Sequence, residues 1–240
     1  MKKIFLLLFV LTNVACTAYA EENFEVDTFE TSKGELKITF LGHASLMVNF
    51  DGKIIYIDPW SRMADYSKFP KADLVLSSHE HIDHLDPAAL DMVCTGETIL
   101  LYPESCARKY KGGIVMKYGD KIIAKGFAVE TVPAYNTFKK RVHPYGLVNG
   151  YVVTFGDKIV YFAGETGDIP ELDKLKDKDI DIAFLAMDSV YNTTPKMAAR
   201  AAKIIKPRIL YPIHTADEDP SKLVDLLKDT DIDVRIRKMR

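Results

Sequence analysis

Short apolar runs, continuous or alternating with polar residues, recur along the chain between residues 36 and 237. Turn signals such as Asp51–Gly52 and Gly156–Asp157 separate neighbouring runs. Runs of this kind predict β-strands. The predicted strands are residues 36–42, 45–50, 53–58, 73–77, 98–102, 113–117, 121–125, 127–133, 150–155, 158–164, 181–186, 208–213 and 233–237.

Helical patterns fit between several of these strands. Asp86–Pro87 and Thr194–Pro195 each supply a capping residue followed by proline at the first helical position. Hairpins early in each half of the chain and helices later predict two sheets packed face to face with helices outside. The expected fold is therefore α+β, a four-layer αββα sandwich. The predicted helices are residues 86–94, 103–111, 170–176, 195–206 and 219–228.

The amino-terminal end has a pattern of its own. Two lysines precede an apolar run over residues 4–14, and a small-residue sequence AYA follows at 18–20. This pattern predicts a signal peptide over residues 1–20, cleaved before Glu21, and a periplasmic or secreted protein without a stable membrane anchor. An uncleaved anchor would need about 20 apolar residues. A lipoprotein at Cys16 is the alternative, although Asn13 stands where a lipobox has an aliphatic residue.

No repeat, low-complexity tract or Pro/Ser-rich linker divides the remaining chain. We expect a polar leader at residues 21–34 and one domain over residues 35–240. Without Lys2 and Lys3, the 32 basic residues fall to 30 against 34 acidic ones. A weakly acidic surface carries no electrostatic footprint for nucleic acid. The partner expected is a small-molecule substrate, and the oligomeric state stays open.

Cys94 and Cys106 remain after cleavage, and an oxidising compartment would allow them to pair. The predicted strand TILLY lies between them and spans about 16 Å. Bridged Cα atoms lie within about 7 Å of each other. We therefore expect two unpaired cysteines.

Half of the six histidines lie within the sequence SSHEHIDHLD at 77–86. This loop follows a predicted buried strand and precedes a predicted helix. In extended backbone His79, His81 and Asp83 project to one side, and the turn toward the helix brings His84 beside them. Neutral imidazoles and a carboxylate are donors of the kind that zinc prefers, so the cluster predicts a metal site. The H-E-x-x-H motif is absent, because position 83 is Asp.

The motif H-x-H-x-D-H after a buried strand resembles the signature of the metallo-β-lactamase-fold hydrolases. FLGHASLMV, IDPW, VPAYNTFKKRVHPYG, YFAGET and YPIHT follow in that family's order, so the resemblance covers nearly the whole mature chain. The sequences of these segments are most similar to the branch with ascorbate-phosphate lactonase and the N-acylphosphatidylethanolamine phospholipases. The resemblance implies two divalent ions, zinc in the first place with manganese as the alternative.

The resemblance also implies a ligand for each matching position. One ion would be held by His79, His81 and His143, and the other by Asp83, His84 and His214. The bridging carboxylate would be Glu165, where the family normally has Asp. The extra methylene moves the carboxylate by about a bond length, whereas metal–oxygen distances tolerate about ±0.2 Å. A rearranged metal pair, a weakened second site and a degenerate site are the outcomes left open.

Four further residues are candidates for supporting roles. His43, in LGHAS, is either a pocket-wall residue near the ligands or an ordinary packed histidine. Asp58 is expected to orient a ligand imidazole through its other ring nitrogen, or else to be a turn residue before a proline. Asn136 and Tyr191 are candidates for the pocket rim, with plain loop roles as the alternative.

The reaction expected of such a site is hydrolysis by a metal-activated water, with Asp83 and His84 as the catalytic residues. The chain has no G-x-S-x-G motif, and its cysteines lie away from the cluster. Ester, phosphodiester and lactone substrates follow from the branch resemblance. The alternative is an exported metal- or ligand-binding protein without turnover, because Glu165 departs from the family pattern. Flavodiiron chemistry fits less well, since those proteins carry Glu at the place of His81 and a flavin domain.

Overall fold

The computed structural model describes residues 23–138, 140–191 and 193–239. The predicted signal peptide, its cleavage point before Glu21 and Cys16 lie outside these residues. None of the helices in the described part of the chain has the length and hydropathy needed to cross a bilayer.

Two seven-stranded mixed sheets form the centre of the molecule. In the first sheet, β1–β4 are antiparallel and β4–β7 are parallel. In the second, β8–β11 are antiparallel and β11–β14 are parallel. The strands of the first sheet are β1 (Glu25–Thr31), β2 (Gly34–Gly42), β3 (Ser45–Phe50), β4 (Lys53–Ile57), β5 (Leu74–Leu76), β6 (Ile99–Tyr102) and β7 (Ile114–Val115). Those of the second are β8 (Lys121–Ala124), β9 (Phe127–Ala134), β10 (Val148–Phe155), β11 (Lys158–Phe162), β12 (Ile182–Ala186), β13 (Ile209–Ile213) and β14 (Asp233–Val234).

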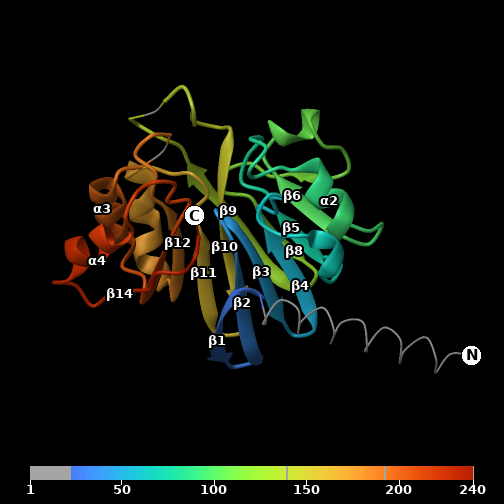
Figure 1. Ribbon diagram of the computed structural model, residues 1–240, viewed down its shortest axis with the longest axis horizontal. Helices are drawn as coiled ribbons and strands as arrows, with labels where there is room; N and C mark the ends of the chain where they lie inside the picture. Colours follow the sequence, from blue (N-terminus) through green and yellow to red (C-terminus); the bar gives the residue numbers. More distant parts are fainter. Residues whose placement is uncertain (1–22, 139, 192, 240) are drawn as a thin grey trace, which may run out of the picture.

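Helices cover the outer face of each sheet, with α2 on one side and α3 and α4 on the other (Figure 1). The two predicted caps are present, because the Asp86 side chain accepts from Ala88 N and the Thr194 side chain from Met197 N. The predicted helices near residues 103–111 and 170–176 are instead 3₁₀ turns. The α-helices are α2 (Pro87–Val93), α3 (Pro195–Ile205) and α4 (Ser221–Leu227), and the 3₁₀ helices are η1 (Tyr66–Lys68), η2 (Cys106–Arg108) and η3 (Pro170–Lys178).

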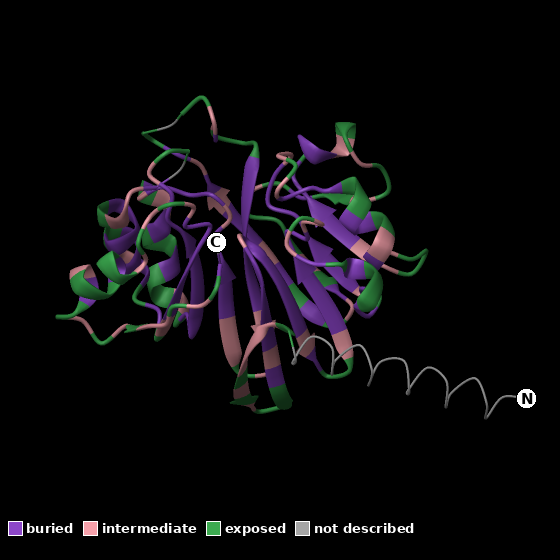
Figure 2. Ribbon diagram, viewed as in Figure 1, coloured by how far each residue is buried: buried purple, intermediate pink, exposed green. Residues whose placement is uncertain are grey.

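Three apolar clusters separate the four layers. The central one joins the facing sides of the two sheets; the ring centroids of Phe40 on β2 and Phe184 on β12, for example, lie 6.3 Å apart. The other two lie between a sheet and its covering helices. Figure 2 shows the buried residues concentrated along the strands, with exposed residues on the helices and loops. The predicted αββα sandwich is confirmed.

The segment predicted as a polar leader, residues 21–34, differs from that expectation. Glu25–Thr31 forms β1, the edge strand of the first sheet, in register with Gly34–Phe40 of β2. Its residues are half-buried or exposed, and none is fully buried. An edge strand of this kind needs few apolar residues, which explains why the hydrophobic pattern did not reveal it. The folded unit therefore includes residues before position 35.

Both cysteines are free, as expected. They flank β6, which keeps them apart. Burial raises the pKa of the Cys94 thiol to about 11 and that of Cys106 to about 12, so neither is an activated thiolate. Cysteine chemistry plays no part in the candidate site below.

Candidate metal centre

The histidine loop follows β5, and two more candidate residues follow β11 and β13. Parallel strands in one sheet present their carboxyl ends at the same edge, so Glu165 and His214 come together beyond β11 and β13. The two sheets meet at this end through a hydrogen bond from Asn149 N on β10 to Ser78 O, 2.8 Å long. Figure 1 shows the loops of both sheets gathered at this end.

The structure brings all the predicted ligands together in two groups. Within each group the candidate donor atoms lie within 4.8 Å of one another. The first group, cluster one, is His79, His81, His143 and Glu165, and the second, cluster two, is His43, Asp83, His84 and His214. The six residues predicted to bind two ions therefore fall into two groups divided in the predicted way, and His43 joins the second.

Cluster one has distances suited to a small divalent ion. His79 Nε2 lies 2.9 Å from His81 Nδ1 and 3.6 Å from Glu165 Oε2. His143 Nε2 contacts the same glutamate oxygen. Ligand atoms bound about 2.1 Å from a tetrahedral zinc ion lie about 3.4 Å from one another. A small rearrangement of these side chains would therefore accommodate such an ion.

Cluster two is centred on one carboxylate oxygen. Asp83 Oδ2 lies 3.0 Å from His43 Nε2, 3.5 Å from His84 Nε2 and 3.4 Å from His214 Nε2. Three imidazole nitrogens thus converge on a single acceptor. Imidazole and carboxylate together are zinc donors, whereas calcium and magnesium prefer oxygen alone.

Glu165 is a member of cluster one that also contacts cluster two. Its Oε2 faces His79 and His143, while its Oε1 lies 2.6 Å from His214 Nε2 and 3.6 Å from His84 Nε2. Gly164 precedes it with φ of 59°, and a Cβ there would lie 2.8 Å from the backbone oxygen of Asn149. Glycine thus allows the chain to turn tightly so that the longer glutamate reaches both groups. Of the outcomes left open for this substitution, the arrangement favours the rearranged pair.

Several buried polar atoms of the two clusters make no hydrogen bond within the described part of the chain, although His143 Nε2 and His214 Nε2 each lie against an oxygen of Glu165. A buried donor or acceptor without a partner costs about 1–3 kcal/mol, so such a concentration needs a cause. Divalent ions would satisfy one nitrogen of each ring and the glutamate oxygen, and the residues therefore fit a metal pair. The atoms are His84 Nε2, both ring nitrogens of His143, both ring nitrogens of His214 and Glu165 Oε2.

Asp58 makes the contact expected of it. Its Oδ2 lies 2.8 Å from His84 Nδ1, so the other nitrogen of that ring faces the metal position. Asp58 also accepts from Ser78 N and Ser78 Oγ, at 2.6 and 2.7 Å. Ser78 Oγ in turn lies 3.0 Å from His79 Nδ1. One buried carboxylate thus orients an imidazole of each cluster, directly or through a serine.

Asp188 was missed by the sequence analysis. It follows β12 and is buried, and its Oδ2 lies 3.7 Å from His214 Nδ1. That oxygen has no hydrogen-bond partner among the described residues. The available signal was a carboxylate just after a buried strand, the same signal that marked Asp58. Asp188 thus lies beside the ring of His214 without a hydrogen bond to it.

His43 is more deeply involved than expected. It adopts a left-handed backbone conformation with φ of 56°, and its carbonyl accepts from His214 N at 2.8 Å. Its ring lies 3.7 Å from that of His214 and 4.9 Å from that of Trp60. These contacts hold its Nε2 toward Asp83, which places His43 within the cluster and not merely on the pocket wall.

The two rim candidates behave differently. Asn136 is buried, its Oδ1 accepts from Phe138 N, and its N donates to His143 O at 2.9 Å. It therefore shapes the loop that carries His143 and does not form the pocket rim. Tyr191 is exposed, on the loop after Asp188, where a rim residue could lie.

The two clusters differ in their electrostatics. Burial, and for His79 the nearby His84, lowers the pKa of His79 and His81, which favours neutral, metal-ready rings. Burial also opposes protonation of His214, but the carboxylates of Glu165 and Asp83 outweigh it and raise its pKa to about 9. Asp58 likewise raises the pKa of His84 well above its usual value despite burial.

Metal binding should therefore strengthen as pH rises. Below about pH 9 the metal-free protein holds a proton on His214, and a protonated imidazole cannot bind an ion. Each proton that binding must displace changes the apparent affinity about tenfold per pH unit. We expect zinc affinity at cluster two to rise at least about tenfold from pH 7 to pH 8. Chelator competition at the two pH values checks this, and a flat profile would contradict it.

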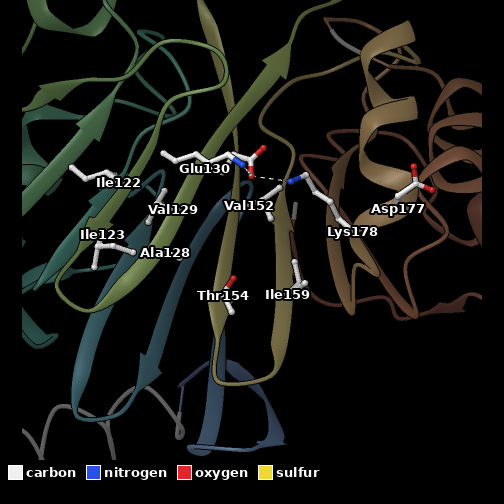
Figure 3. A pocket seen from close by; sticks show the side chains of 11 residues that line it. Ile122, Ile123, Ala128, Val129, Glu130, Val152, Thr154, Ile159, Asp177 and Lys178 are labelled. Carbon is white, nitrogen blue, oxygen red and sulfur yellow. Dashed lines mark hydrogen bonds and ion pairs between the residues drawn. The ribbon is translucent and has the colours of Figure 1, made fainter.

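A separate cavity lies on the outer face of the second sheet, between the β8–β9 hairpin and η3 (Figure 3). Its volume is about 590 Å³. Glu130 and Lys178 pair across it at 2.8 Å, as the dashed line in Figure 3 shows. No residue of the two clusters lines it. It has no part in the chemistry of the metal centre.

Comparisons with known proteins agree with this geometry. A beta-lactamase superfamily domain matches residues 37–214. A UPF0173 metal-dependent hydrolase of Methanopyrus kandleri is 30% identical over 221 residues, covering 84% of this chain and 95% of its own.

Solved structures give the same result. A Parabacteroides distasonis protein, described provisionally as a metal-dependent hydrolase, is 46% identical with a TM-score of 0.87, over 90% of this chain and all of its own. A metallo hydrolase of Ignicoccus hospitalis is 26% identical with a TM-score of 0.71, over 84% and 94% of the two chains. With two candidate metal sites on this fold, the chain belongs to the metallo-β-lactamase superfamily and, within it, to the UPF0173 family of metal-dependent hydrolases.

Proposed function

We propose that this protein hydrolyses a small-molecule ester, phosphodiester or lactone with the help of two divalent ions, zinc in the first place. The observation that carries the proposal is the position of Glu165, whose two oxygens face different clusters. Two ions bound in this way would lower the pKa of a shared water and polarise the substrate. The side chain of Glu165 would set the distance between the two ions.

Besides binding an ion, Asp83 and His43 of cluster two are proposed to transfer a proton. Asp83 is about a quarter exposed, whereas Glu165 and His84 are buried, so Asp83 lies on the open side of the centre. Its carboxylate also contacts His43 Nε2 at 3.0 Å. This pair is placed to take up the proton that an attacking water loses and to return it to the leaving group. His84 acts by keeping its ring fixed between Asp58 and the metal position.

The substrate class rests on the surroundings of the centre. Lys140 and Arg141 lie exposed on the loop that carries His143 and would attract a phosphate or carboxylate. A net charge near zero argues against polynucleotides. The test is a panel of bis-p-nitrophenyl phosphate, p-nitrophenyl acetate, acyl lactones and nitrocefin with zinc or manganese. We expect turnover of a phosphodiester, ester or lactone; nitrocefin as the only good substrate would contradict the proposal.

A second candidate function is metal or ligand binding without turnover. Glu165 favours it, because a longer side chain at a bridging position can bind ions yet hold them badly for catalysis. The two candidates differ in one result. Fully metallated protein that is silent across the whole panel would support the binding role.

We also propose that the protein is exported, because of the amino-terminal pattern. Expressed with its leader in a Gram-negative host, the protein should appear in the periplasm and begin at Glu21. Cell fractionation and amino-terminal sequencing check this prediction. A lipid-modified Cys16 or an intact Met1 on a cytoplasmic product would contradict it.

A further inference from the structure

Exposed apolar side chains gather around the metal centre. Eleven large hydrophobic residues are exposed in the described part of the chain, and six of them lie on the loops that carry or adjoin the metal ligands. Scattered exposed apolar residues are ordinary, whereas a group of them beside a polar site marks a binding surface. This group, the apolar collar, consists of Ile82, Phe138, Tyr145, Leu147, Val190 and Tyr191.

Covalent neighbours and hydrogen bonds place parts of the collar beside the two clusters. Ile82 stands between His81 and Asp83, so it cannot be far from either cluster. Val190 N donates to Asp188 Oδ1 at 2.8 Å, and the other oxygen of Asp188 faces His214. The loop that carries His143 also carries Tyr145, two residues after it.

One residue of the collar, Tyr145, is held in place by packed aromatic neighbours. The ring of Tyr145 lies 5.2 Å from that of Tyr118 and 5.2 Å from that of Tyr135. Tyr118 accepts from Gly146 N and donates to Ala134 O, which fixes the base of this aromatic group. The exposed ring is therefore presented by packed neighbours. Figure 1 shows the loop between β9 and β10 and the loop after β12 at the same end of the molecule as the loop after β5.

We propose that the collar binds an apolar acyl or aryl group of the substrate while its ester or phosphoester group reaches the ions. This inference rests on the proposed function, and it narrows the substrate to an amphiphilic small molecule. A fully polar substrate would leave the six side chains in water beside the reacting group. An apolar substituent would instead remove them from water on binding.

The test measures carboxylate binding to zinc-loaded protein by calorimetry, with acetate and hexanoate as probes, so it does not depend on turnover. Each methylene removed from water strengthens binding roughly fourfold. Hexanoate should therefore bind at least about tenfold more tightly than acetate if two methylenes reach the collar. Equal affinities, or no binding of either carboxylate, would overturn the proposal.

Variants locate the effect. Ile82→Ser and Tyr191→Ser should each reduce the hexanoate-to-acetate affinity ratio at least about threefold while leaving acetate binding unchanged. Ile123→Ser is the matched control, since Ile123 is 70% exposed and Ile82 60%, but Ile123 lies on edge strand β8 away from the ligands. An equal effect in the control would overturn the proposal. If the protein prefers hexanoate but turns over no panel substrate, the result would support binding at the collar and contradict the proposed hydrolase function.

Discussion

Replacing Glu165 with glutamine will lower bound zinc from about two ions per chain to about one, and hydrolysis at least about a hundredfold. The reason is geometric, because one carboxylate supplies an oxygen to both clusters. Glutamine keeps the shape but removes the negative charge and gives one of the two positions an NH₂ group, which cannot ligate. Elemental analysis of dialysed protein, together with rates on the best panel substrate, checks the prediction.

Glu80→Gln is the control for this change. Glu80 lies in the histidine loop itself, and its carboxylate pairs with Lys109 at 3.7 Å instead of facing the ions. The substitution removes one acidic charge near the centre but no ligand, so metal content should stay near that of the unmodified protein. If Glu165→Gln retained both ions, the glutamate would not bridge them.

Replacing Asp58 with asparagine will weaken zinc binding about 10- to 100-fold without removing a ligand. The buried carboxylate accepts from both Ser78 and His84, and it is within reach of no ion position in either cluster. Asparagine can present an NH₂ group to His84 Nδ1 and turn the ring to its other tautomer, with the proton on the metal side. Competition with a chromophoric chelator measures the affinity, and the melting temperature reports any loss of folding.

Asp65→Asn is the matched control. Asp65 is an exposed carboxylate in the same connection between β4 and β5, where it caps η1 and contacts Ser67. Its replacement should leave metal affinity unchanged. An unaltered affinity in Asp58→Asn, with both variants folded, would show that the carboxylate does not position His84.

The strand pattern of the sequence predicted the fold well, since each predicted strand is present near its expected bounds. Period-2 and buried apolar runs are strong signals because most strands place a face in one of three apolar layers. β1 has no buried residue and so left no such pattern. The 3₁₀ turns at η2 and η3 share the start signals of helices, which explains why they were expected to be regular.

The two groups of candidate ligands could be predicted because their spacing matches a known motif, whereas the residues around them depended on tertiary contacts. His43 stands 40 positions before Asp83 and meets it only through folding. Asp188 lies 26 positions before His214, and a lone Asp after a strand carries little information by itself. Asn136 was expected at the pocket rim, but its hydrogen bonds are used within the loop of His143.

A crystal structure of zinc-loaded protein, with anomalous scattering recorded at the zinc edge, tests the central claim most directly. We predict two zinc peaks about 3.5–4 Å apart, one in each cluster, with one oxygen of Glu165 on each ion. His43 should lie beside the second ion with its Nε2 toward Asp83. A single peak, or two peaks with the Glu165 side chain turned away from one of them, would contradict the proposed bridge.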